Sequence, residues 1–137
     1  MKETPANLQG IRVLLVDDEL DARGALAAIL ESFGAEVHVA GSVKEGLRIF
    51  SELKPDVLVS DIGMPDEDGY SLIRKIRSLK VQQGKKIPAL ALSAYAASED
   101  VSRAIDSGFL KHIAKPVDSI VLSHAIAEAA QIGKLTR

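Results

Sequence analysis

Three aspartates follow short apolar runs of this sequence, at positions where their carboxylates could meet. Asp17 and Asp18 come directly after the run 11–16, and Asp61 comes directly after the run 56–60. Carboxylates that share a small pocket repel one another, and the arrangement is tolerable when a cation occupies it. An all-oxygen site that can also reach a phosphate suits Mg²⁺.

A hydroxyl and an ammonium group stand at two further run ends. Ser93 closes the run 88–93, and Lys115 follows the run 109–114. A lysine can pair with a carboxylate at rest and with a phosphoryl group later. Taken singly, each residue has an ordinary explanation: an aspartate before a helix is a good cap, and a lysine before a proline is commonly solvated. Their joint placement favours a functional site.

The apolar runs predict five strands of a parallel sheet. They are Ile11–Val16, Glu36–Ala40, Asp56–Ser60, Pro88–Ser93 and Phe109–Ala114. The central runs are apolar without alternation, which is typical of strands buried on both faces. Because the carboxyl ends of parallel strands lie at one edge, the polar residues above would share that edge.

Helical spacing separates these runs, with apolar residues recurring every three or four positions. The first stripe comprises Ala22, Leu26, Ile29, Leu30 and Phe33, and the last comprises Val121, Leu122, Ala125, Ile126 and Ala129. Gly34, Gly108 and Gly133 are expected near helix ends. The pattern predicts an α/β fold, a doubly wound (βα)5 flavodoxin-like sandwich. Five strands fit the order 2-1-3-4-5, with the switch point between strands 1 and 3.

The length of 137 residues suits one domain, expected at 11–131 between a flexible N-terminal tail or linker (1–10) and a C-terminal tail (132–137). The absence of cysteine excludes a disulfide scaffold and thiol chemistry.

A net charge of −2 and few aromatic residues argue against direct nucleic-acid binding. No apolar stretch approaches a membrane span and no signal peptide is evident, so a cytoplasmic location without direct membrane contact is expected.

Taken together, these segments resemble the receiver domain of two-component response regulators. The resemblance covers about 11–131. It is carried by VLLVDDE at 13–19, PDVLVSDIGMP at 55–65 with the Asp-Gly pair at 68–69, ALSA at 91–94, and Lys-Pro at 115–116.

The resemblance implies a phosphorelay function. Asp61 matches the phosphoacceptor, which receives a phosphoryl group from a sensor histidine kinase or a histidine phosphotransfer protein. The implied cofactor is Mg²⁺ (or Mn²⁺), with Asp18, Asp61 and the Gly63 carbonyl as direct ligands and Asp17 acting through water. Ser93 and Lys115 match the residues that contact phosphoryl oxygens, and the Lys115–Pro116 bond matches one that is cis. Such a domain is a signalling module rather than an enzyme, beyond its own phosphorylation and dephosphorylation.

His112 stands at the switch position of the fifth strand, where tyrosine or phenylalanine is common in the family. With Ser93 it is expected to change a downstream protein interface on the helix 4–strand 5–helix 5 face. An imidazole is polar and titratable, so this switch is expected to depend on pH. The chain ends resemble receivers attached to hybrid sensor kinases, so both a single-domain regulator and an excised receiver fit.

Three other functions fit this sequence less well. A constitutive interaction module with the same fold would not need the complete acidic, hydroxyl and lysine set. A hydrolase of the haloacid-dehalogenase type has a second aspartate two residues after the nucleophile, where Gly63 stands here. A flavin carrier would need a Ser-, Thr- and Gly-rich loop after the first strand, which this sequence lacks.

Overall fold

The computed structural model describes residues 4–64, 67–79, 87–94 and 98–135. Its elements follow in the order β1 (Arg12–Val16), α1 (Leu20–Ser32), β2 (Glu36–Ala40), α2 (Val43–Leu53), β3 (Val57–Asp61), α3 (Gly69–Arg77), β4 (Ala89–Ser93), α5 (Ser98–Ser107), β5 (Lys111–Ala114) and α6 (Ser119–Leu135). All strand pairs are parallel, and the sheet order is β2-β1-β3-β4-β5. The predicted doubly wound fold and strand order are therefore confirmed.

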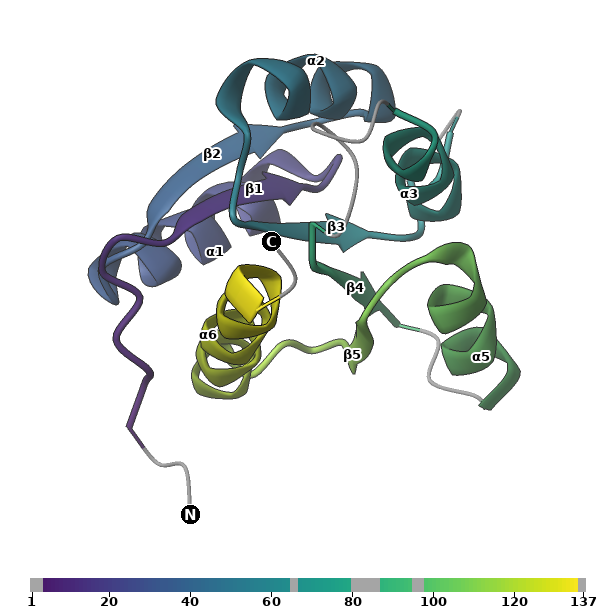
Figure 1. The fold of residues 1–137 in the computed structure, drawn as a ribbon. Coiled ribbons are helices and arrows are strands. Elements are labelled where there is room, and N and C mark those ends of the chain that lie inside the picture. The colour runs from purple at the N-terminus through teal and green to yellow at the C-terminus, as the bar shows by residue number, and fades with distance from the viewer. Residues whose placement is uncertain (1–3, 65–66, 80–86, 95–97, 136–137) are drawn as a thin grey trace.

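The sheet lies between two helical layers (Figure 1). α1 and α6 cover one face, and α2, α3 and α5 cover the other. Every residue of β3 and β4 is buried, as continuous apolarity predicts for central strands, whereas the edge strand β2 is partly exposed. Each face has its own core cluster, built from one set of alternating strand residues and one helical layer.

Capping residues and a glycine account for where several of the helices begin or end. The Ser42 side chain accepts from the Glu45 amide at the start of α2, and the Asp68 side chain accepts from the Ser71 amide at the start of α3. Such caps satisfy amide groups that have no partner within the helix. Gly34 follows α1 with φ +106°, a conformation that a residue with a side chain rarely adopts.

The segment before β1 is packed against the domain, in contrast to the expected flexible tail at 1–10. Leu8 is fully buried in the cluster under α1 and α6, and its amide donates to the Phe33 carbonyl at 2.8 Å. The Ala6 amide donates to the Ser123 hydroxyl of α6 at 2.9 Å. A single apolar residue within a polar stretch has no periodicity, so the sequence pattern did not reveal this anchor. Residues 1–3 lie outside the described part.

The last helix also departs from expectation. α6 continues to Leu135, beyond the predicted boundary at 131, so residues 132–135 are helical rather than a tail. Gly133 lies two residues before Leu135, near the helix end as expected, but within the helix. A Cβ at Gly133 would lie 3.2 Å from the Pro88 ring, so the glycine permits close packing of the helix on the segment before β4.

The predicted apolar stripe of α1 divides between two environments. Leu30 is fully buried, but Ala22 is exposed and 38% of the Ile29 surface remains accessible. The stripe is therefore wider than the surface that the sheet covers. Within the described residues, no helix is long and apolar enough to cross a membrane.

Candidate functional site

Three carboxylates meet at the carboxyl edge of the sheet because β1 and β3 are neighbours. Val16 pairs with Ser60, so the next residues of the two strands, Asp17 and Asp61, lie side by side. One carboxylate oxygen from each of Asp17, Asp18 and Asp61 lies within 4.8 Å of the others. Asp17 and Asp61 are buried, with 4% and 6% exposure, whereas Asp18 is exposed.

Asp61 has a charged partner. The Lys115 ammonium donates to its Oδ2 at 3.0 Å, and the Gly63 amide donates to its Oδ1 at 3.3 Å. Burial raises the pKa of Asp61 above its ordinary value of 3.8, and the nearby Asp17 acts in the same direction, while the Lys115 contact opposes both. The carboxylate is thus held in place by donors at a position where its charge is poorly solvated.

Hydrogen bonds that involve backbone groups fix the loop after β1. The Asp17 amide donates to the Ala40 carbonyl at 3.0 Å, and the Asp17 Oδ1 accepts from the Glu19 amide at 2.9 Å. The guanidinium of Arg23, one turn into α1, donates to the Asp17 carbonyl at 3.0 Å. Nothing in the sequence singles out Arg23, because a lone arginine on a helix carries no motif.

The loop after β3 turns back sharply on the strand. The Met64 and Gly69 amides both donate to the Ile62 carbonyl, at 3.0 and 2.9 Å. A Cβ at Gly69 would lie 2.6 Å from the Asp61 carbonyl oxygen, so only glycine fits this close approach. In contrast, among the described residues no atom apart from those of its chain neighbours lies within 4 Å of a Cβ built at Gly63.

β4 and β5 bring the hydroxyl and the lysine to the same edge. Asp61 pairs with Leu92, which places the buried Ser93 one residue further along. Ser93 pairs with Ala114, and the Lys115 amide donates to the Ser93 carbonyl at 2.9 Å. The Lys115–Pro116 bond is cis, as expected.

His112 lies within β5, opposite Ala91 of β4. Its side chain is partly buried, and its Nε2 is a buried atom without a hydrogen-bond partner among the described residues. A buried polar atom left without a partner costs about 1–3 kcal/mol. No hydrogen bond to the described residues offsets this cost at Nε2.

A groove of about 340 Å³ opens beside the carboxylates. Asp17 and Lys115 lie at its polar end, and α1 contributes the apolar side chains of Ala22, Ala25, Leu26 and Ile29. Pro116 and Val117 line the side formed by the segment between β5 and α6. The accessible part of the α1 stripe thus continues directly into the acidic site.

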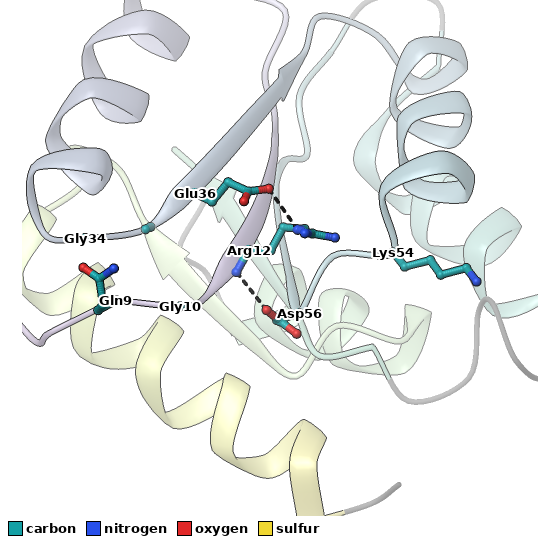
Figure 2. A pocket seen from close by; sticks show the side chains of 8 residues that line it. Gln9, Gly10, Arg12, Gly34, Glu36, Lys54 and Asp56 are labelled. Carbon is teal, nitrogen blue, oxygen red and sulfur yellow. Dashed lines mark hydrogen bonds and ion pairs between the residues drawn. The ribbon is translucent and has the colours of Figure 1, made fainter.

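A larger hollow of about 420 Å³ lies at the opposite edge of the sheet (Figure 2). There the Arg12 guanidinium pairs with Glu36 at 2.9 Å, and the Arg12 amide donates to Asp56 at 2.8 Å. Figure 2 shows the Lys54 side chain extending away from these three residues. This hollow is at the amino ends of β1 and β2, so it is separate from the carboxylate cluster.

The acidic residues fit a divalent cation of the Mg²⁺ type. Hard cations prefer oxygen ligands, and Mg²⁺ typically takes one or two carboxylates, a phosphate and several waters. Two of the three acids are buried and Asp18 is exposed, so the cluster is open to solvent on one side. Lys115 is placed to neutralise further negative charge.

Comparisons with known proteins agree with this site. The model of the response regulator receiver domain family matches residues 13–127. A protein of Leptolyngbya boryana, the "Uncharacterized 14.6 kDa protein in sodA1 3'region", is 42% identical over 116 residues, covering 85% of this chain and 87% of its own. Hybrid signal transduction histidine kinase D of Dictyostelium discoideum is 36% identical over 125 residues, covering 87% of this chain but only 8% of the kinase.

A solved structure supports the same assignment. The crystal structure of a response regulator receiver domain protein from Clostridium thermocellum superposes with a TM-score of 0.84 at 30% identity, covering 93% of this chain and 99% of that one. The chain belongs to the response regulator receiver domain family. It is a signalling domain of two-component phosphorelays, a class that interacts with histidine kinases or phosphotransfer proteins.

Proposed function

We propose that this receiver domain accepts a phosphoryl group on Asp61 from a phosphohistidine donor, in a reaction that depends on Mg²⁺. The single observation that carries the proposal is the cluster of Asp17, Asp18 and Asp61 with Lys115 bonded to Asp61. A constitutive module would gain nothing from two buried, mutually repelling carboxylates.

In the proposed step, a carboxylate oxygen of Asp61 forms a bond to phosphorus as the P–N bond of the donor breaks. The bonding electrons stay on the imidazole nitrogen, which then takes up a proton, and Asp61 becomes an acyl phosphate. Lys115 would exchange its carboxylate oxygen for a phosphoryl oxygen. The Ser93 hydroxyl at the end of β4 would bond to another phosphoryl oxygen.

Asp18, Asp61 and the Gly63 carbonyl would hold the metal directly, and Asp17 would hold it through water. When bound, the ion neutralises charge on the phosphoryl oxygens. The protein's own part is to keep the acids close together before the ion arrives. Mn²⁺ suits the same oxygen ligands.

The surfaces beside the site suggest where partners bind. The groove along α1 joins an apolar face to Asp17 and Lys115, so it suits a helix of the phosphodonor. On another side, Ile105 of α5, Leu110 before β5 and Val121 of α6 are exposed apolar side chains. We assign the α5–β5–α6 face to the downstream target, with Ser93 and His112 transmitting the change.

The test is labelling by a small phosphodonor. Acetyl phosphate with Mg²⁺ should add one phosphoryl group, measured by intact mass, and EDTA should prevent the addition. Asp61→Asn should abolish labelling because an amide is not a nucleophile of this kind. Asp106→Asn, which changes an exposed acid of α5, should label like the unmodified protein. Full labelling of Asp61→Asn would contradict the proposal.

A further inference from the structure

Arg23 is bonded to the acidic loop through its backbone rather than through a carboxylate. Its Nη1 donates to the Asp17 carbonyl at 3.0 Å. That carbonyl belongs to the peptide bond joining Asp17 to Asp18, so the contact fixes the plane from which both acidic side chains project. The Ala40 carbonyl holds the Asp17 amide at 3.0 Å. Asp17 is thus held by hydrogen bonds at both its amide and its carbonyl.

The position of the guanidinium is set by a neighbouring glycine. A Cβ at Gly41 would lie 2.5 Å from Arg23 Nη1, closer than real Cβ contacts allow. The other nearby atoms, Arg23 Cζ at 3.6 Å and Glu45 Oε1 at 3.9 Å, are at ordinary contact distances. The Gly41 amide in turn donates to Glu45 Oε1 at 2.7 Å, which anchors this turn to α2. Gly41 therefore leaves space that the guanidinium occupies.

From these contacts we infer that Arg23 is a positioning residue for the proposed Mg²⁺ site, and that Gly41 is required for it to act. The inference rests on the proposed function. Three carboxylates within 4.8 Å repel one another and tend to separate in the absence of a cation. By fixing the Asp17–Asp18 peptide, Arg23 limits that separation before the metal binds. Groups that orient metal ligands in this way commonly contribute 10–100-fold to metal affinity.

Electrostatic repulsion between Arg23 and the cation, taken alone, predicts the opposite effect of removing Arg23 on Mg²⁺ affinity. Removing a positive charge near the acids should strengthen the binding of a cation. If Arg23 acts by positioning, Arg23→Gln should instead weaken Mg²⁺ binding, by about tenfold. Gly41→Ala retains the charge and displaces the guanidinium, so it should weaken binding to a similar extent. The double variant should bind about as weakly as either single variant, because both changes remove the same contact.

The experiment is a calorimetric Mg²⁺ titration of the metal-free full chain, with the free energy of unfolding of each variant measured in EDTA. Two controls match the changes: Arg48→Gln removes an exposed arginine of α2, and Gly24→Ala adds a methyl in α1 where, beyond the helix's own backbone, no atom of the described residues lies within 4 Å. Both should leave Mg²⁺ affinity within about twofold.

Several results would overturn the inference. The first is tighter Mg²⁺ binding by Arg23→Gln, and the second is an unchanged affinity in Gly41→Ala. The third is a double variant whose loss of Mg²⁺ affinity equals the product of the fold-losses in the two single variants. A change in unfolding free energy alone, with unchanged affinity, would assign Arg23 a purely structural role. If the unmodified protein binds no Mg²⁺, the proposed function itself fails, and this inference fails with it.

Discussion

Asp61 is subject to opposing influences on its charge. Its burial disfavours the ionised form, and Asp17 adds repulsion, while Lys115 donates to Oδ2 at 3.0 Å. The net effect is a pKa above the ordinary value of 3.8. An acid whose pKa is raised by folding destabilises the folded state whenever it is ionised, because the unfolded chain solvates the charge better.

We therefore expect Asp61→Asn to stabilise the metal-free protein at pH 7, on the order of 1 kcal/mol. The gain should be complete above the folded-state pKa and should shrink as the pH falls through it towards 3.8, where the unfolded chain also becomes protonated. Urea denaturation in EDTA between pH 4 and 8 measures this, with Asp106→Asn as the exposed control. A loss of stability at pH 7 would mean that the Lys115 pair outweighs burial.

At the scale of elements, two helical glycines differ in how closely another backbone approaches them. Gly69 begins α3 directly against β3, where a Cβ would meet the Asp61 carbonyl at 2.6 Å and the Ile62 Cα at 2.8 Å. Gly24 lies within α1, and in the described part of the chain nothing outside the local helix backbone is within 4 Å of a Cβ at this position. One glycine thus permits a close contact that positions the site, and the other weakens a helix without an evident packing role.

This contrast predicts opposite effects of the same substitution. Gly69→Ala should destabilise the protein by about 1–3 kcal/mol, because the backbone of Asp61 and Ile62 at the end of β3 must move to admit the methyl group. Gly24→Ala should stabilise it by about 0.5–1 kcal/mol through helix propensity. Thermal or urea unfolding measures both. Equal effects of the two variants would show that backbone contact does not restrict position 69.

At the scale of the whole molecule, the N-terminal segment belongs to the folded unit. Leu8 is fully buried between the α1 and α6 layer and the sheet. The Leu8 amide donates a hydrogen bond to the Phe33 carbonyl at the end of α1, and the Ala6 amide donates one to the Ser123 hydroxyl of α6, so the segment is tied to both helices. This segment therefore extends the apolar core beyond the β1 start at Arg12.

Leu8→Ala should lower the free energy of unfolding by about 2–5 kcal/mol, because it removes a fully buried side chain and leaves a cavity. Leu20→Ala is the matched control. Leu20 is 69% exposed, so its change should stay within about 0.5 kcal/mol. Urea unfolding with both variants measures the difference. An effect at Leu8 as small as that at Leu20 would show that residues 4–10 contribute no packing energy.

The sequence alone determined the alternation of strands and helices and the polar residues at their carboxyl ends. These features are local: a helix repeats its buried face every 3.6 residues, and a strand buried on both faces is apolar throughout. Asp17, Asp61, Ser93 and Lys115 were identifiable because each immediately follows or closes such a run. The family resemblance then supplied the expected role of each.

Only the tertiary structure decided which of these residues meet. The cluster exists because β1 pairs with β3, and strand order depends on packing between segments far apart in sequence. The same holds for Leu8, which is anchored by α1 and α6, and for Arg23, whose partner is a backbone carbonyl. A backbone carbonyl is present in every residue, so such a contact leaves no signature in the sequence. Its role follows from three-dimensional proximity alone.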